Sequence, residues 1–281
     1  LLLDGVDAYV TSSTAVKMPS GGDFTIEAWV RPLPRGAGPV MVGTGHIETI
    51  VSWGSGITAQ INATDAVNAS NATFASNITN ASNATAAKDA TNRTAAAPPT
   101  DHNTLALVDG YLTSGVCCTA GAFSEKVESA NHVGNRVGWG VWHHVAATQD
   151  GTTRRLYVDG ELVKQEEMAA PAPTPMQIDI GGKADSAGLL YGSVAHVRVW
   201  NLARTRSQLL GTMQSALVES SDQNGLVGEW PMVRQRLRLF EGKKVNDTSG
   251  MGNHATLANG AVFGSACPLS SGGVSSVAVI G

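Results

Sequence analysis

The sequence has few charged residues and no long apolar run. Asp, Glu, Lys and Arg make up 15% of its 281 residues, well below the roughly 25% usual in soluble globular domains. Glycine is abundant instead, with 32 residues, and this composition favours an all-β protein with many turns. The net charge of −4 gives no global field that would attract nucleic acid or an anionic membrane. No apolar run reaches the length of about 18 residues that predicts a membrane span.

Cysteine is also scarce, and the three cysteines are Cys117, Cys118 and Cys267. In a secreted chain, an odd number leaves one thiol unpaired or paired outside the segment. We expect a disulfide from Cys267 to either Cys117 or Cys118, because a bridge between the adjacent pair would close a strained ring. No Cys/His spacing of zinc type accompanies them. The chain lacks an initial Met and a leader peptide, so we expect a piece of a longer secreted protein.

One segment, residues 55–103, is unusually rich in acceptor patterns for N-glycosylation. Such N-x-S/T patterns are glycosylated only in the secretory pathway, so this clustering predicts an extracellular or cell-surface protein. The alternative is Ala/Asn/Thr low-complexity sequence that is never glycosylated. The segment has few large apolar residues, and we expect a long disordered or sugar-stiffened insertion. The predicted glycosylation sites are Asn62, Asn68, Asn71, Asn77, Asn80, Asn83 and Asn92, with an eighth at Asn246.

Strand-like runs separated by glycine-rich turns fill most of the remaining sequence. Two Asp-Gly pairs, Asp109-Gly110 and Asp159-Gly160, predict two-residue hairpin turns. One apolar stripe at a spacing of four, Thr205 to Leu217, predicts a short helix. The expected strands lie in residues 23–30, 46–54, 104–116, 140–150, 153–167, 176–182, 192–201, 225–230 and 245–264.

The order of these segments resembles the laminin-G-like jelly roll of the concanavalin A-like lectin/glucanase group. The resemblance covers nearly the whole chain outside the insertion and the tail at 265–281. Five motifs carry it in the correct order: LDGVDAYVTS (3–12), DFTIEAWVRP (23–32), WHHVAATQDG (142–151) with LYVDGELV (156–163), VAHVRVWNLARTRSQL (194–209), and GLVGEWPM (225–232) with NDTSGMGNHATLANGA (246–261).

The resemblance implies an all-β, two-sheet antiparallel jelly-roll sandwich over residues 1–264, with one short helix. Its core is expected to include Trp29, Trp142 and Trp200. In this family the strand and turn resembling residues 225–264 precede the opening phrase. We therefore expect that segment either to return and pair beside the first strand or to begin a further repeat.

The catalytic pattern of the glucanase branch is missing. Those enzymes carry paired carboxylates on one strand, and no E-x-D-x-x-E run occurs here. Glu27 is a lone carboxylate, which we interpret as structural or solvated. His143 and His144 are expected to point to opposite faces of a strand, and His196 to pack structurally. No G-x-S-x-G nucleophile elbow is present.

Two binding sites are candidates from residue type. The resemblance implies calcium at a loop edge, and the oxygen ligands available in turns are Asp4, Asp7, Asp247 and Asn253. The same residues also suit turns through their own side-chain hydrogen bonds. Arg234, Arg236 and Arg238 alternate along one expected strand face, where guanidinium groups can bind sulfated or carboxylated glycans. The alternative is an ordinary solvated face.

These observations favour a non-catalytic extracellular module of a larger glycoprotein, which contacts neighbouring protein modules or glycans. A carbohydrate-binding lectin domain is the alternative, and a glycoside hydrolase or lyase is a third hypothesis. Because one fold serves many functions, the choice of ligand rests on analogy.

Overall fold

The structure is a computed structural model of the chain. It describes residues 1–13, 16, 22–34, 46–54, 102–117, 123–129, 136–169, 177–182, 188–215, 217, 223–232 and 243–264. The chain divides into two compact units, residues 1–56 with 101–281 and residues 57–100. All described residues lie in the first unit. The seven clustered sequons, Arg234, Arg236, Arg238, Cys118 and Cys267 lie outside the described residues, as does the side chain of Cys117.

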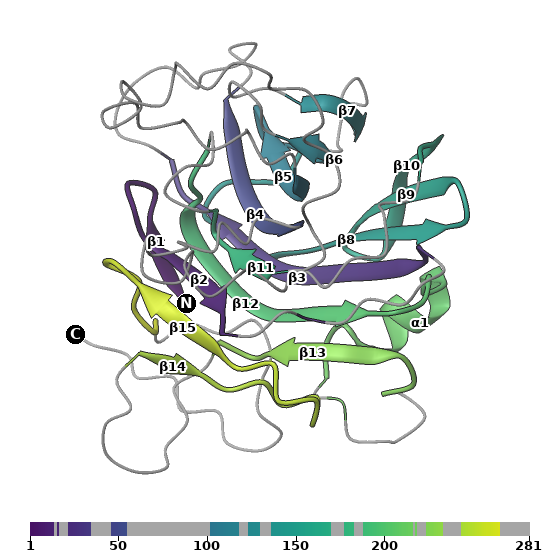
Figure 1. Ribbon diagram of the computed structural model, residues 1–281. Helices are drawn as coiled ribbons and strands as arrows, with labels where there is room; N and C mark the ends of the chain where they lie inside the picture. Colours follow the sequence, from purple (N-terminus) through teal and green to yellow (C-terminus); the bar gives the residue numbers. More distant parts are fainter. Residues whose placement is uncertain are drawn as a thin grey trace, which may run out of the picture. The chain divides into compact units, whose positions relative to one another are not determined.

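The described residues form two antiparallel sheets, which confirms the predicted all-β sandwich (Figure 1). The seven-stranded sheet has the order β1-β12-β3-β8-β9-β10, with β13 also paired to β12. Its strands are β1 (Leu2–Asp4), β3 (Phe24–Pro32), β8 (His143–Asp150), β9 (Thr153–Val158), β10 (Glu161–Glu167), β12 (Tyr191–Trp200) and β13 (Leu226–Trp230).

The eight-stranded sheet has the order β14-β15-β2-β11-β4-β5-β6-β7. Its strands are β2 (Tyr9–Ser12), β4 (Ile47–Gly54), β5 (His102–Val108), β6 (Tyr111–Cys117), β7 (Phe123–Glu128), β11 (Gln177–Ile180), β14 (Lys244–Val245) and β15 (Ala255–Ala258). Strand β5 begins at His102, so the sequence-based end of the insertion at residue 103 is wrong by two residues.

Both Asp-Gly pairs form the predicted hairpin turns. Asp109 and Gly110 have φ angles of 51° and 84°, and Asp159 and Gly160 have φ angles of 52° and 80°. Positive φ at both central positions is the mark of a type I′ turn, whose twist matches that of the flanking strands. These turns fix the registers of β5 with β6 and of β9 with β10.

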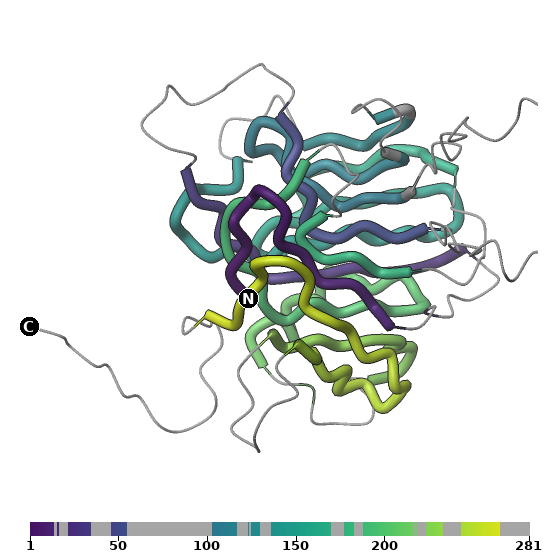
Figure 2. Tube along the Cα trace, turned by 60° about the vertical axis from the view of Figure 1, so that its left-hand side comes forward, coloured from purple at the N-terminus to yellow at the C-terminus, as the bar shows by residue number. Residues whose placement is uncertain are grey.

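The N-terminal and C-terminal segments pair within one sandwich. In Figure 2 the yellow C-terminal strands run beside the purple N-terminal ones. Strand β15 pairs with β2 from Ala255 opposite Ser12 to Ala258 opposite Tyr9, and β13 pairs with β12. The described part of residues 225–264 therefore adds strands to both sheets of the sandwich that contains β1 and β2.

The hydrophobic core fills the space between the sheets and is built from alternating residues of each strand. On β3 the inward residues Phe24, Ile26, Ala28 and Val30 are all buried. The Phe24 ring packs edge-on against Trp53 of β4, with 5.3 Å between ring centroids. Alternation thus places every second side chain of β3 in the core.

The tryptophans of the core differ from the predicted ones. Trp53 and Trp230 lie in it, whereas Trp200 belongs to a separate buried cluster and Trp29 and Trp142 are half-buried. Val145 faces the core, and alternation places residue 142 on the opposite side. The Trp142 ring instead lies 5.3 Å from the guanidinium carbon of Arg31. The prediction that Trp142 lies in the core is therefore wrong, because Trp142 and Val145 lie on opposite faces of the sheet.

A β-bulge and one helix complete the part of the seven-stranded sheet that matters for function. The pairing of β12 with β3 shifts between Ala195 and Arg198, and His196 at the bulge has a φ angle of 47°. The extra residue moves Val197 into the core. The predicted helix is α1 (Arg206–Thr212), whose capping box joins Thr205 and Gln208. No described helix is long and apolar enough to cross a membrane.

Candidate functional site

A buried polar cluster lies between the outer face of the seven-stranded sheet and α1. Glu27 is on β3, His144 is on β8 and Arg198 is on β12, and all three face away from the core. The strand register explains this grouping, because Glu27 pairs directly with Arg198 on one side and with Ala146 on the other. The whole Glu27 side chain is shielded from solvent, with 0% exposure. The outer face of a sheet is buried here because the helix covers it.

Glu27 accepts bonds from two elements that are distant in sequence. Its Oε1 accepts hydrogen bonds of 3.1 Å from Trp200 Nε1 and of 3.1 Å from Arg204 Nη1. Its Oε2 lies 3.3 Å from His144 Nε2. Burial by itself would raise the pKa of Glu27, but His144, Arg198 and Arg204 outweigh it and hold that pKa at about 2. Glu27 is therefore a permanent anion at neutral pH.

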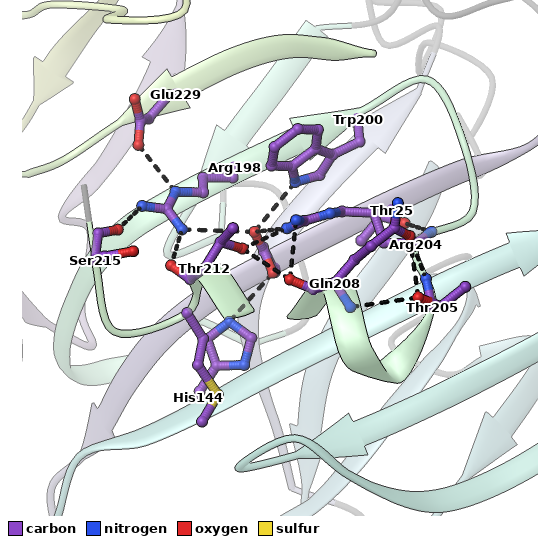
Figure 3. Close-up of polar contacts among 12 residues, drawn as sticks. Thr25, His144, Arg198, Trp200, Arg204, Thr205, Gln208, Thr212, Ser215 and Glu229 are labelled. Atoms are coloured by element: carbon purple, nitrogen blue, oxygen red, sulfur yellow. Dashed lines mark hydrogen bonds and ion pairs between the residues drawn. The ribbon is translucent and has the colours of Figure 1, made fainter. Parts of the chain in front are cut away.

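The two arginines attach α1 and the turn after it to the sheet. Arg198 donates from Nε to Glu229 Oε1 at 2.9 Å, from Nη1 to the Thr212 carbonyl at 2.9 Å and from Nη2 to the Ser215 carbonyl at 2.7 Å. Arg204 donates to Thr212 Oγ1 at 2.8 Å. Figure 3 shows both guanidinium groups lying between the sheet and the helix. The cluster balances two carboxylates against two guanidinium groups, which is the condition for burying charge.

This cluster is built for structure and not for acid–base chemistry. A general acid or base must reach the substrate and have a pKa near the working pH. Glu27 has no solvent exposure and a pKa of about 2. The interpretation of Glu27 as a structural carboxylate agrees with this geometry.

His143 is also engaged in structural contacts. His143 and His144 point to opposite faces, as predicted. His143 Nε2 accepts a hydrogen bond from the Gly138 amide at 3.1 Å, so Nδ1 carries the proton and donates to Asp159 Oδ2 at 2.7 Å. Burial would raise the pKa of Asp159, but the bond from His143 outweighs it and lowers that pKa. His196 is half-buried, and burial lowers its pKa to about 4.

The four predicted calcium ligands form two separate turn structures. Asp4 Oδ1 accepts from the amides of Val6, Asp7 and Ala8, and the Val6 bond leads the causes that lower the pKa of Asp4. Asp247 accepts from three amides through both oxygens, including that of Asn253 at 2.8 Å. Amide donors around an oxygen disfavour a cation there. Among the described residues no group of three His, Cys, Asp or Glu side chains could hold a metal.

A pocket of about 320 Å³ lies beside the buried cluster. Trp200, Leu202 and Arg204 line it from the sheet side. Ser207, Gln208 and Gly211 line it from α1, and Asn224 lies in the segment before β13. Sequence reasoning named none of these pocket residues as functional. Gly211, a glycine inside the predicted helix, was the one signal that could have pointed to it.

Comparison with known proteins identifies a family model and solved structures that this chain resembles. Residues 83–210 match the laminin G family model described as the concanavalin A-like lectin/glucanases superfamily. A candidate carbohydrate-binding protein from Bacteroides ovatus ATCC 8483 has a similar structure, with a TM-score of 0.52 at 18% identity. That match covers 91% of this chain and 59% of the other.

Two further structures are less similar. The heptameric SAP-like pentraxin of Limulus polyphemus has a TM-score of 0.45 at 12% identity, over 91% of this chain and 92% of that one. Domains LG4-5 of the mouse laminin alpha1 chain give 0.40 at 15% identity, over 70% and 40%. No curated protein matches the chain in sequence. The resemblance read from the motifs is confirmed by the family match over residues 83–210 and by the two antiparallel sheets.

Proposed function

We propose that this chain is a non-catalytic interaction module of a secreted or cell-surface glycoprotein, and that it contacts neighbouring protein modules or glycans. The superfamily includes both lectins and glucanases, so the fold alone leaves binding and catalysis open. The observation that supports the non-catalytic part is the state of Glu27. The carboxylate on the central strand β3 is fully buried, ion-paired and held at a pKa of about 2.

Incubation with a panel of neutral and acidic polysaccharides tests the non-catalytic part. We expect no release of reducing ends or unsaturated products by the full chain. Sustained product release that disappears in a Glu27→Gln variant of intact fold would overturn the proposal and establish a glycoside hydrolase or lyase. A glycan array and cross-linking to native neighbours test the binding part, for which we expect saturable binding to a glycan or a protein module.

The extracellular part of the proposal depends on the sequons. Asn246, the one that lies among the described residues, is exposed directly after β14, so an oligosaccharide has room there. Peptide mass spectrometry after enzymatic deglycosylation of the native protein should show Asn-to-Asp conversion at most of the clustered sites between Asn62 and Asn92. Unmodified asparagine at most of these positions would contradict secretion.

Calcium and the arginine face are subsidiary parts of the proposal. Of the four predicted calcium ligands, Asp247 has both oxygens engaged, and Asn253 donates its backbone amide to that same carboxylate. Asp4 Oδ2 and Asp7, in the other turn, are therefore the ligands to test. Adding calcium to chelator-treated protein should raise its melting temperature if those loops bind the ion, and Asp7→Asn should remove that rise. For the arginines, a glycan-array signal lost on changing Arg234, Arg236 and Arg238 to Gln would support a lectin role.

A further inference from the structure

We propose that the pocket between α1 and the segment before β13 binds one neutral sugar ring of a glycan. This inference rests on the proposed binding function and names a site and a ligand class for it. The pocket volume of about 320 Å³ lies at the lower end of the range of about 300–1,000 Å³ found for small-molecule sites. It suits a single hexose unit better than a longer segment of chain.

The exposed polar groups that line the pocket are neutral. Ser207, Gln208 and Asn224 are all exposed, and they offer a hydroxyl and two carboxamides. Gln208 Oε1 is already held by the Thr205 amide at 2.8 Å, which orients the side chain. Within the described residues no hydrogen bond engages the Gln208 amide nitrogen, the Ser207 hydroxyl or the Asn224 side chain. Donors and acceptors of this kind match the hydroxyl groups of a sugar.

The charged group in the pocket wall is already neutralised. Arg204 is 5% exposed, donates to Glu27 and lies 4.0 Å from the centroid of the Trp200 ring. Since its charge is matched inside the protein, an anionic ligand gains little from it, and a neutral ligand loses nothing. Leu202, which is half-buried and lines the pocket, adds an apolar surface for the C–H face of a sugar ring.

Gly211 makes the pocket testable without disturbing the fold. A Cβ atom at Gly211 would meet no heavy atom within 4 Å, so a side chain there would project into open space beside the lining residues. Alanine is a better helix former than glycine. Gly211→Ala should therefore preserve both the fold and the pocket, whereas Gly211→Phe should fill the pocket.

The experiment is calorimetric titration of the full chain with D-glucose, D-galactose, D-mannose and N-acetyl-D-glucosamine. We expect saturable binding of at least one sugar, with affinity reduced by about tenfold or more in Gly211→Phe and also reduced in Asn224→Ala. Gly211→Ala should bind like the parent. Gly264→Phe adds the same ring at another glycine with open space around its Cβ, and it should bind like the parent too.

The outcomes separate this inference from the proposed function. If no sugar of the panel binds saturably, or if Gly211→Phe binds as tightly as the parent, the pocket assignment is wrong. A glycan-array or protein-partner signal that persists in Gly211→Phe would then leave the interaction module standing with a different surface. Polysaccharide cleavage dependent on Glu27 would instead overturn the module itself.

Discussion

The two faces of strand β3 are both buried, but one packs in an apolar core and the other in a cluster of charged side chains. The inner face presents Phe24, Ile26 and Val30 to an apolar core. The outer face presents Glu27 to His144 and two arginines beneath α1. In an apolar core, the free energy of unfolding falls in proportion to the number of methylene groups removed, because burial of each one contributes a similar amount. In a charge-balanced cluster, removal of one member leaves its partners buried without compensation.

The largest effect is expected from Glu27→Gln, which keeps the shape of the side chain and removes its charge. Arg204 and Arg198 have Nη1 atoms 3.1 Å and 3.8 Å from Glu27 Oε1. The cluster would then keep one buried carboxylate, Glu229, which pairs with Arg198. Breaking a buried ion pair in this way costs about 3–5 kcal/mol. Urea denaturation should show that loss in the free energy of unfolding.

Ile26→Val is the matched control, because it changes the neighbouring residue of the same strand on the core side. Its cost should be about 0.5–1.5 kcal/mol. Equal losses in the two variants would show that the charges of the cluster are not needed for stability. A double-mutant cycle of Glu27→Gln with Arg204→Gln should give a coupling energy of about 0.5–3 kcal/mol.

Acidic pH should destabilise the fold by protonating Glu27. The pKa of Glu27 in the folded chain is about 2, below the ordinary value of 4.5. A carboxyl with a depressed pKa contributes stability above its unfolded pKa and loses it as the pH falls towards the folded pKa. Melting temperatures measured from about pH 6 to about pH 2 should therefore fall most steeply below about pH 4.5. The curve for Glu27→Gln should be flatter, and an unchanged slope would contradict the assignment.

The tryptophans give a second contrast between core and surface, of similar expected size. Trp53 is 1% exposed in the core, so Trp53→Ala should cost about 3–5 kcal/mol. Trp142 is half-buried, and its contact with Arg31 is of the kind worth about 0.5–1 kcal/mol at exposed sites. Differential scanning calorimetry should show a much smaller fall in melting temperature for Trp142→Ala. Equal falls in melting temperature for the two variants would show that Trp142 belongs to the core.

Local patterns in the sequence were enough to predict most of the strands and both hairpins, although β1, β2 and β7 lie outside the expected ranges. Alternation marks the predicted strands, and the Asp-Gly pairs fix the turns through the positive φ angles that Gly110 and Gly160 accept. The same alternation gives the face of every residue, provided that the parity is counted from a core residue such as Val145. Trp142 was misplaced because the alternating positions were counted wrongly from Val145, and strand alternation itself holds there.

The polar cluster could not be predicted in the same way, because it depends on strand neighbours far apart in sequence. Glu27 meets Arg198 only because β3 lies between β12 and β8. The bulge at His196 also shifts the register just before Arg198. No local sequence pattern predicts this bulge. The pocket depends further on how α1 sits beside the segment at Asn224, which the apolar stripe of the helix leaves undetermined.

The smallest effect is expected from removing the insertion, residues 55–101, and joining Gly54 to His102 through an Asn-Gly turn. Strands β4 and β5 are neighbours with Trp53 opposite Asn103, so a two-residue hairpin fits their register. Each halving of loop length returns only about 0.6 kcal/mol of closure entropy. Thermal unfolding should stay cooperative, with a melting temperature equal to or slightly above that of the parent. A deletion that also removes Trp53 and Asn103 should melt lower, because it takes core area with it. Loss of the cooperative transition in the shorter deletion would show that the insertion contributes to the fold of the sandwich.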